Sequence, residues 1–385
     1  MTSLSCLFRP AIVLALSAAL AGCALDGGLT STASAPIRSA QFDLDIDWVF
    51  PLNPKTTFYL GTKPLELGHI AVTDNVTYVG STLSKVVAIH NQKATQIWEA
   101  EMTAPVTAGP VVTPNGVFVA LGDGAILRLD PANGNILWRY DTMVPIENAI
   151  TVQDGVVACV NGNNRLFVLN ASDGTVKWKR ERPRSSEFTM YGQAAPLIHD
   201  GFLYAGYSDG FLTAYALENG TAIWSRELAP DARFKDLDAQ PVIFDNILYA
   251  ANSSGGIYAL ALSDGRTLWQ RDIRGISSLI PHQDSIYLTS QSGFFRLDRA
   301  SGHTLWQNEI QKEALISPMQ LGRNHIYASV QRFGLVIIDR ATGETSHVID
   351  MGTDFTSPPV LTNGTLTALS NRSTVYRLFV QDYPL

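Results

Sequence analysis

One segment of the sequence matches the nucleophile pattern of a hydrolase. Residues 206–210 read G-Y-S-D-G, which fits the G-x-S-x-G elbow that exposes a catalytic serine between a strand and a helix of an α/β sheet. No helical pattern follows here, and the segment aligns with short turns such as residues 122–124. Because the required strand and helix are missing, we predict that Ser208 is a turn residue and that the chain has no catalytic site.

Carboxylates and imidazoles are the side chains that would bind a metal. Asp43, Asp45 and Asp47 resemble the start of a calcium loop, but the Gly and Glu that complete such a loop do not follow. These residues alternate with apolar ones, which predicts a strand with its carboxylates on the solvent face. The histidines show no ligand spacing, so we expect no metal or other cofactor, although spacing leaves a site assembled between repeats open. They are His69, His90, His199, His282, His303, His325 and His347.

Cysteine chemistry is confined to the N-terminal region and one internal position. Cys159 lies in the apolar run 156–160, which favours a buried, unreactive thiol. Residues 1–22 have the charged, apolar and small-residue regions of a secretory signal. Leu20-Ala21-Gly22-Cys23 resembles a bacterial lipobox, which implies acylation of Cys23. Residues 23–40 are rich in Gly, Ser, Thr and Ala and predict a flexible tether before a globular part, residues 41–385.

The charge balance argues against a nucleic-acid partner. The full chain carries a net charge of −7. Removal of residues 1–22 takes away Arg9 and no acidic residue, which leaves 27 basic against 35 acidic side chains, or −8. An acidic domain is a poor surface for nucleic acids or anionic lipids. No later segment has the roughly 18 to 20 apolar residues of a membrane helix.

A tryptophan repeat with a period near 40 residues decides the expected fold. Several of the tryptophans follow an N-G or D-G turn, as Trp138 follows Asn133-Gly134, and a further copy of the repeat has His347 in the tryptophan position. Spacings between the second and the last tryptophan are 40, 40, 46, 45 and 37 residues. The repeat tryptophans are Trp48, Trp98, Trp138, Trp178, Trp224, Trp269 and Trp306.

Each repeat contains four short strands, which is typical of a propeller blade. Third-strand segments occur eight times, and the last one, 374–379, has no tryptophan strand after it. The segment 42–50 is a tryptophan strand with no blade before it. We therefore predict an all-β, eight-bladed propeller of four-stranded antiparallel blades, in which the N-terminal strand completes the last blade and the tryptophans pack between neighbouring blades.

Two neighbouring repeats carry insertions, at 180–193 and 228–240, and insertions at equivalent points of repeats project from one face. The first contains Phe188, Met190 and Tyr191, and the second contains Asp236, Leu237 and Asp238. Aromatic and methionine anchors beside charges are typical of a protein interface, although plain loop filler is the alternative. The basic run 177–184 favours a solvated outer strand.

The lipobox, the tether, the eight units and the D-x-x-x-G-x-x-x-W repeat together resemble the BamB-type lipoproteins of the outer-membrane β-barrel assembly machinery. The resemblance implies a non-enzymatic, monomeric scaffold, anchored in the outer membrane and facing the periplasm, that docks on the third periplasmic domain of the barrel protein BamA. It carries the docking role to Phe188, Met190, Tyr191, Asp236 and Asp238. Tyr191 stands where the family has an arginine, and Arg182 or Arg184 is the nearby substitute.

Two other functions remain open at this point. The repeat also resembles that of quinone-dependent dehydrogenases, but these are longer, and the calcium-binding constellation that they carry is not found in the sequence. A propeller that binds another envelope protein or a glycan is the third possibility, because a fold alone does not fix a function.

Overall fold

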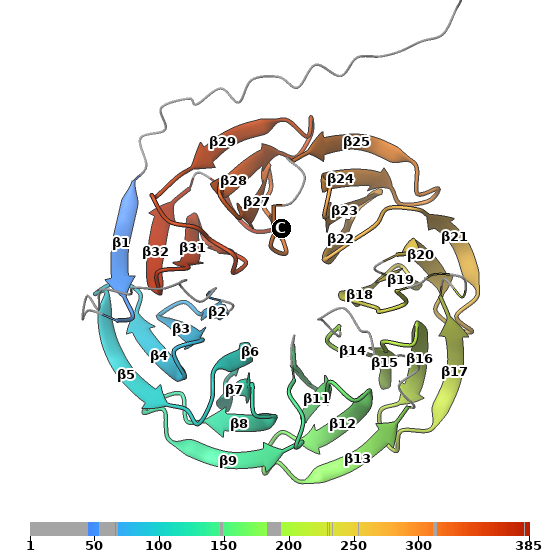
Figure 1. The fold of residues 1–385 in the computed structure, drawn as a ribbon, viewed down its shortest axis with the longest axis horizontal. Helices are drawn as coiled ribbons and strands as arrows, with labels where there is room; N and C mark the ends of the chain where they lie inside the picture. Colours follow the sequence, from blue (N-terminus) through green and yellow to red (C-terminus); the bar gives the residue numbers. More distant parts are fainter. Residues whose placement is uncertain are drawn as a thin grey trace, which may run out of the picture. The chain divides into compact units, whose positions relative to one another are not determined.

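The computed structural model describes residues 45–53, 66, 68–146, 149–182, 194–228, 230, 232, 234–252, 254–310, 314–380 and 382–385. Every regular element in these ranges is a β-strand, and none of them contains a helix that could span a membrane. The strands form eight four-stranded antiparallel sheets set around a ring (Figure 1). The predicted eight-bladed propeller is confirmed.

In each blade, successive strands lie progressively farther from the ring axis (Figure 1). Blade 1 holds β2 (Ile70–Val72), β3 (Val76–Ser81), β4 (Lys85–His90) and β5 (Thr95–Glu101), and blade 2 holds β6 (Val106–Thr113), β7 (Gly116–Leu121), β8 (Ala125–Leu129) and β9 (Ile136–Asp141). Blade 3 holds β10 (Thr151–Gln153), β11 (Val156–Val160), β12 (Arg165–Asn170) and β13 (Val176–Glu181), and blade 4 holds β14 (Leu197–His199), β15 (Phe202–Gly206), β16 (Phe211–Ala216) and β17 (Ala222–Glu227). Blade 5 holds β18 (Ala239–Phe244), β19 (Ile247–Asn252), β20 (Gly256–Ala261) and β21 (Thr267–Arg271), and blade 6 holds β22 (Ser278–His282), β23 (Ser285–Ser290), β24 (Gly293–Asp298) and β25 (Thr304–Glu309). Blade 7 holds β26 (Gln320–Leu321), β27 (His325–Val330), β28 (Gly334–Asp339) and β29 (Thr345–Ile349), and blade 8 holds β30 (Val360–Thr362), β31 (Thr365–Ser370), β32 (Thr374–Phe379) and β1 (Ile46–Pro51).

The hydrophobic core lies between neighbouring blades. All five residues of β11 are buried, because this strand is covered on both faces by the adjoining sheets. One apolar cluster joins Val168 and Trp178 of blade 3 to Leu203 and Tyr207 of blade 4. The outermost strand β13 has solvent on one side and buries only Trp178. The repeat tryptophan is therefore the main apolar contribution of an outer strand.

Each tryptophan links its blade to the next one around the ring. The indole Nε1 donates to a backbone carbonyl of the following blade, and the indole ring covers the glycine of that blade's last turn in six of the seven cases. The Nε1–O distances are 2.7 Å from Trp48 to Asn91, 2.8 Å from Trp98 to Pro131, 3.1 Å from Trp138 to Ala171, 2.9 Å from Trp178 to Leu217, 3.1 Å from Trp224 to Leu262, 3.1 Å from Trp269 to Arg299 and 3.2 Å from Trp306 to Arg340. The covered glycines are Gly134, Gly174, Gly220, Gly265, Gly302 and Gly343.

Gly174 offers a test of this joint. Its φ is +74°, and a Cβ there would lie 2.7 Å from two atoms of the Trp138 ring. Gly155 in the same blade has a φ of +75° and open space around its Cβ position. We expect Gly174→Ala to lower the free energy of unfolding by about 2 kcal/mol more than Gly155→Ala, because both carry the same backbone strain and only the first displaces the indole. Urea denaturation measures the difference, and equal losses would contradict the role of the tryptophan contact.

The N-terminal strand closes the ring, as the sequence predicts. Strand β1 pairs antiparallel with β32, and Trp48 stands opposite Arg377. Asp47 forms an ion pair with Arg377 at 3.2 Å, so this carboxylate does not simply face solvent. The register shifts between Ile46 and Trp48, and the side chain of Ile46 is 46% exposed. The predicted strict alternation of buried apolar and solvent-facing acidic side chains is thus wrong at Ile46, because the irregular register turns this side chain outward.

The joint between blades 7 and 8 is built differently. His347 occupies the tryptophan register, opposite Ile337. Blade 8 has no turn between its third and fourth strands, because these come from opposite ends of the chain. Asp382, beyond β32, instead accepts hydrogen bonds from the backbone N–H of His325 at 2.9 Å and the hydroxyl of Tyr327 at 3.2 Å in blade 7. A buried carboxylate from beyond β32 therefore links the end of the chain to blade 7 at this joint.

Candidate docking site on the connection face

Strand direction assigns every connection to one of two faces of the ring. Because the four strands of a blade alternate in direction, all connections between blades lie on the same face, together with the turns between second and third strands. We call this the connection face. Three successive connections on it are 142–150, 182–196 and 228–238. The two insertions therefore leave the same face, as the repeat pattern predicts.

The first insertion is only partly described. Phe188, Met190, Tyr191 and Arg184 lie outside the described residues. Arg182 is described, and its guanidinium forms an ion pair with Asp209 and lies 3.7 Å from the centroid of the Phe211 ring. Arg182 thus neutralises a carboxylate of its own chain. It is not the free cation that would substitute for the family arginine.

The second insertion is held close to the ring by Leu237. This side chain is 2% exposed and packs against blade 4, where a Cβ at Gly206 would lie 2.8 Å from the Leu237 Cβ. Its carbonyl accepts a hydrogen bond from the Ala194 N–H at 3.1 Å, which ties the ends of the two insertions together. Leu237 is therefore an anchor of the loop and not a contact that it presents to a partner. Its neighbours Asp236 and Asp238 are recessed with it.

Asp236 and Asp238 form a buried pair of carboxyl groups. Asp236 is 2% exposed, and Asp238 is partly buried. Burial, and secondarily the charge of Asp236, raises the pKa of Asp238 to about 8. The Oδ1 atom of Asp238 is buried without a hydrogen-bond partner among the described residues. A cationic side chain placed beside Asp238 would favour the ionised form of this carboxyl group.

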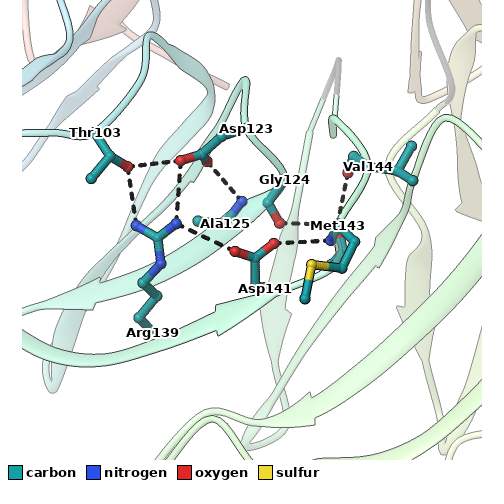
Figure 2. A network of polar contacts seen from close by, with 9 residues as sticks. Thr103, Asp123, Gly124, Ala125, Arg139, Asp141, Met143 and Val144 are labelled. Carbon is teal, nitrogen blue, oxygen red and sulfur yellow. Dashed lines mark hydrogen bonds and ion pairs between the residues drawn. The ribbon is translucent and has the colours of Figure 1, made fainter.

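Met143 lies on the adjacent connection of the same face and was not predicted from the sequence as a site residue. Its side chain is 81% exposed, and its φ is +63°, a conformation that non-glycine residues seldom adopt. Figure 2 shows how the loop is held: Arg139 bridges Asp123 at 3.2 Å and Asp141 at 3.4 Å, and Asp141 accepts the Met143 N–H at 2.9 Å. An exposed methionine whose backbone is held by a polar network is suited to enter an apolar pocket of a partner.

The other chemistry-bearing residues have structural surroundings. Ser208 is 5% exposed, and its hydroxyl donates to Asn164 Oδ1 at 3.0 Å in the predicted turn. Cys159 is fully buried, as predicted, and burial raises its pKa to about 12. Within the described ranges, no group of three His, Cys, Asp or Glu side chains could hold a metal ion.

Comparison with known proteins gives one family. The model of the family described as "Outer membrane protein assembly factor BamB" matches residues 48–145 and 83–308. Proteins of the same description from Nitrosomonas eutropha and Yersinia pestis are 27% and 25% identical over 229 and 192 residues. These matches cover 56% and 47% of this chain, and 55% and 49% of the two relatives. The chain thus spans about half the length of the curated relatives that it matches.

Solved structures agree on the fold. The crystal structure of BamB from Moraxella catarrhalis superposes with a TM-score of 0.74 at 19% identity, covering 88% of this chain and 98% of that one. The quinohemoprotein alcohol dehydrogenase from Comamonas testosteroni superposes with a TM-score of 0.70 at 15% identity, covering 88% and 76% of the two chains. At these identities the likeness concerns the architecture alone.

Proposed function

The chain belongs to the family of the outer membrane protein assembly factor BamB, and from this membership we propose that it is a non-enzymatic scaffold for the assembly of outer-membrane β-barrel proteins. Residues 1–22 are its secretory signal and Cys23 its lipid attachment site. Residues 23–40 tether a propeller, 41–385, at the periplasmic side of the outer membrane. The likeness to the quinohemoprotein dehydrogenase extends to the fold only, so it does not favour an enzyme.

The single observation that carries the docking role is the recessed carboxyl pair on the connection face. Asp236 and Asp238 lie in the segment where the family resemblance places partner contacts, and burial raises the pKa of Asp238 to about 8. The partner in this proposal is a BamA-like barrel protein, whose periplasmic domain brings a cationic side chain to the pair. Phe188, Met190 and Tyr191 belong to the same docking surface, and Met143 extends it by one connection.

Capture in the cell envelope tests the function. A photoreactive residue at Met143 or Tyr191 should cross-link to the barrel protein, because Met143 is exposed on the connection face and Tyr191 belongs to the insertion to which the family resemblance assigns partner contacts. The matched control is Leu137, which is 50% exposed near the start of the outer strand β9, at the opposite end of the strand from the connection that follows it. Deleting the gene should also lower the amount of porins in the outer membrane. Normal porin levels together with no capture at either position would refute the scaffold.

A further inference from the structure

A second site lies on the opposite face of the ring, which carries the turns between first and second strands and between third and fourth strands. A groove of about 330 Å³ opens there at the joint of blades 6 and 7. It is lined by three arginines, Arg296 from β24, Arg323 from the first turn of blade 7 and Arg340 from the last turn of blade 7. This size is at the lower end for small-molecule sites.

The three guanidinium groups are not neutralised by ion pairs. None of them lies within ion-pair distance of a carboxylate in the described part of the chain. Arg296 Nε donates to Ser285 Oγ at 2.9 Å, and Arg340 Nη1 donates to the Gly322 carbonyl at 3.1 Å. Arg323 lies with its Cζ 5.7 Å from the Tyr383 ring centroid. These contacts use one guanidinium nitrogen each of Arg296 and Arg340.

Two acids also line the groove, and they do not cancel the positive charge. Asp339 is occupied by its own turn, since its Oδ1 accepts from the backbone N–H groups of Ala341 at 2.9 Å and Thr342 at 2.8 Å. Asp284 adds a second negative charge. Burial, and secondarily the charge of Arg340, lowers the pKa of His282. With a neutral His282, three arginines against two aspartates leave a net charge of +1.

At the neighbouring joint, between blades 5 and 6, the equivalent arginine is neutralised by an ion pair. Arg299 occupies in blade 6 the turn position of Arg340, and both carbonyls accept a tryptophan Nε1, at 3.1 and 3.2 Å. At that joint Asp245 pairs with Arg299 at 2.8 Å. Its counterpart at the joint of blades 6 and 7 is Gln283, with a φ of +52° against +49° for Asp245. The counterpart of Arg296 in blade 5 is Ala259, since each stands opposite the tryptophan of its blade.

Relative to its neighbour, the joint of blades 6 and 7 has gained a guanidinium at Arg296, and its turn carboxylate lies one position later, at Asp284 instead of position 283. We propose that this groove is a binding site for a phosphoryl group, held by Arg296, Arg340 and Arg323. The planar guanidinium donates paired hydrogen bonds to phosphate oxygens, and several such groups suit a tetrahedral dianion better than a single carboxylate. Free phosphate esters and phospholipid headgroups share this chemistry.

Placing a carboxylate at position 283 gives the sharpest test. Gln283→Asp reproduces the ion pair of the neighbouring joint without touching a proposed ligand, and aspartate tolerates the positive φ. Gln283→Asn is the matched control, because it tolerates the same backbone conformation and adds no charge. In calorimetric titration of the whole protein with inorganic phosphate, Gln283→Asp should weaken binding by about tenfold or more, and Gln283→Asn should change it by less than about twofold. Thermal unfolding of both variants verifies that the fold is retained.

Two further binding experiments distinguish a phospholipid headgroup from a soluble phosphate ester and test the preference for phosphate. Vesicles of phosphatidylcholine with or without phosphatidylglycerol are mixed with the Cys23→Ser protein, which cannot carry an acyl chain. Binding that requires phosphatidylglycerol and is lost in Gln283→Asp supports a headgroup, and binding of inorganic phosphate alone supports a soluble ester. The proposal is overturned if neither probe binds, if acetate binds as tightly as phosphate, or if Gln283→Asp and Gln283→Asn behave alike.

Discussion

Replacing Trp178 by alanine should lower the free energy of unfolding by about 3 to 5 kcal/mol, the usual cost of truncating a buried tryptophan. The indole is 7% exposed and belongs to the cluster that joins blades 3 and 4. Its Nε1 donates to the Leu217 carbonyl at 2.9 Å, and its ring lies against Gly220. Truncation removes the apolar contact, leaves a cavity at the joint, and leaves the Leu217 carbonyl without its hydrogen-bond donor.

Two companion variants separate these contributions. Trp178→Phe keeps most of the apolar volume and loses the hydrogen bond, so it should cost less, although its smaller ring also leaves a gap. Val176→Ala on the same strand, 41% exposed, should change stability by less than about 0.5 kcal/mol. Chemical denaturation followed by tryptophan fluorescence and circular dichroism measures all three. A loss below about 1 kcal/mol for Trp178→Ala would mean that the blades are not joined through this residue.

Replacing Asp238 by asparagine should act in opposite directions on stability and on partner binding. The folded-state pKa of Asp238, about 8, is raised from an ordinary value of 3.8. The folded state therefore binds the proton more tightly, so the stability that this group contributes is fully present below about pH 4 and is lost as the pH rises to about 8. Asparagine resembles the protonated form at every pH. We expect Asp238→Asn to be more stable than the natural protein at pH 8 by an amount on the order of 2 kcal/mol, and nearly equal to it at pH 4.

Partner binding should respond the other way. A cationic side chain favours the ionised carboxyl, so the affinity of the natural protein for the periplasmic domains of the barrel protein should rise between pH 6 and about 8. Asp238→Asn should lose this rise and bind about 30-fold more weakly at pH 8, since removing one partner of a buried charge pair costs 2 kcal/mol or more.

Thermal unfolding across pH and calorimetric binding measure the two effects of this substitution. Asp272→Asn is the control, because Asp272 lies on the next connection of the same face with its side chain 69% exposed. It should change neither quantity. Undiminished partner binding by Asp238→Asn would show that the carboxyl pair is not part of the docking site. Unchanged stability at pH 8 would show that the ionised Asp238 carboxyl does not destabilise the folded state.

The sequence alone determined the architecture. Each blade is a local unit in which the same turn, the same tryptophan and the same four strands recur, so the blade count follows from the repeat. The unmatched ends, Trp48 before the first blade and 374–379 in the last, likewise determined how the ring closes. The placement of the insertions on one face needed only their common position in the repeat.

Tertiary structure decided what each loop residue does. Whether Arg182 is free or paired depends on Asp209, a residue of the next blade. The burial of Asp236 and Leu237 depends on packing of their loop against blade 4, and the exposure of Met143 depends on a network built from several turns. The groove of Arg296, Arg323 and Arg340 exists only where blades 6 and 7 meet. These contacts join side chains that are distant along the chain, and their energies depend on distance and burial, which a repeat pattern does not contain.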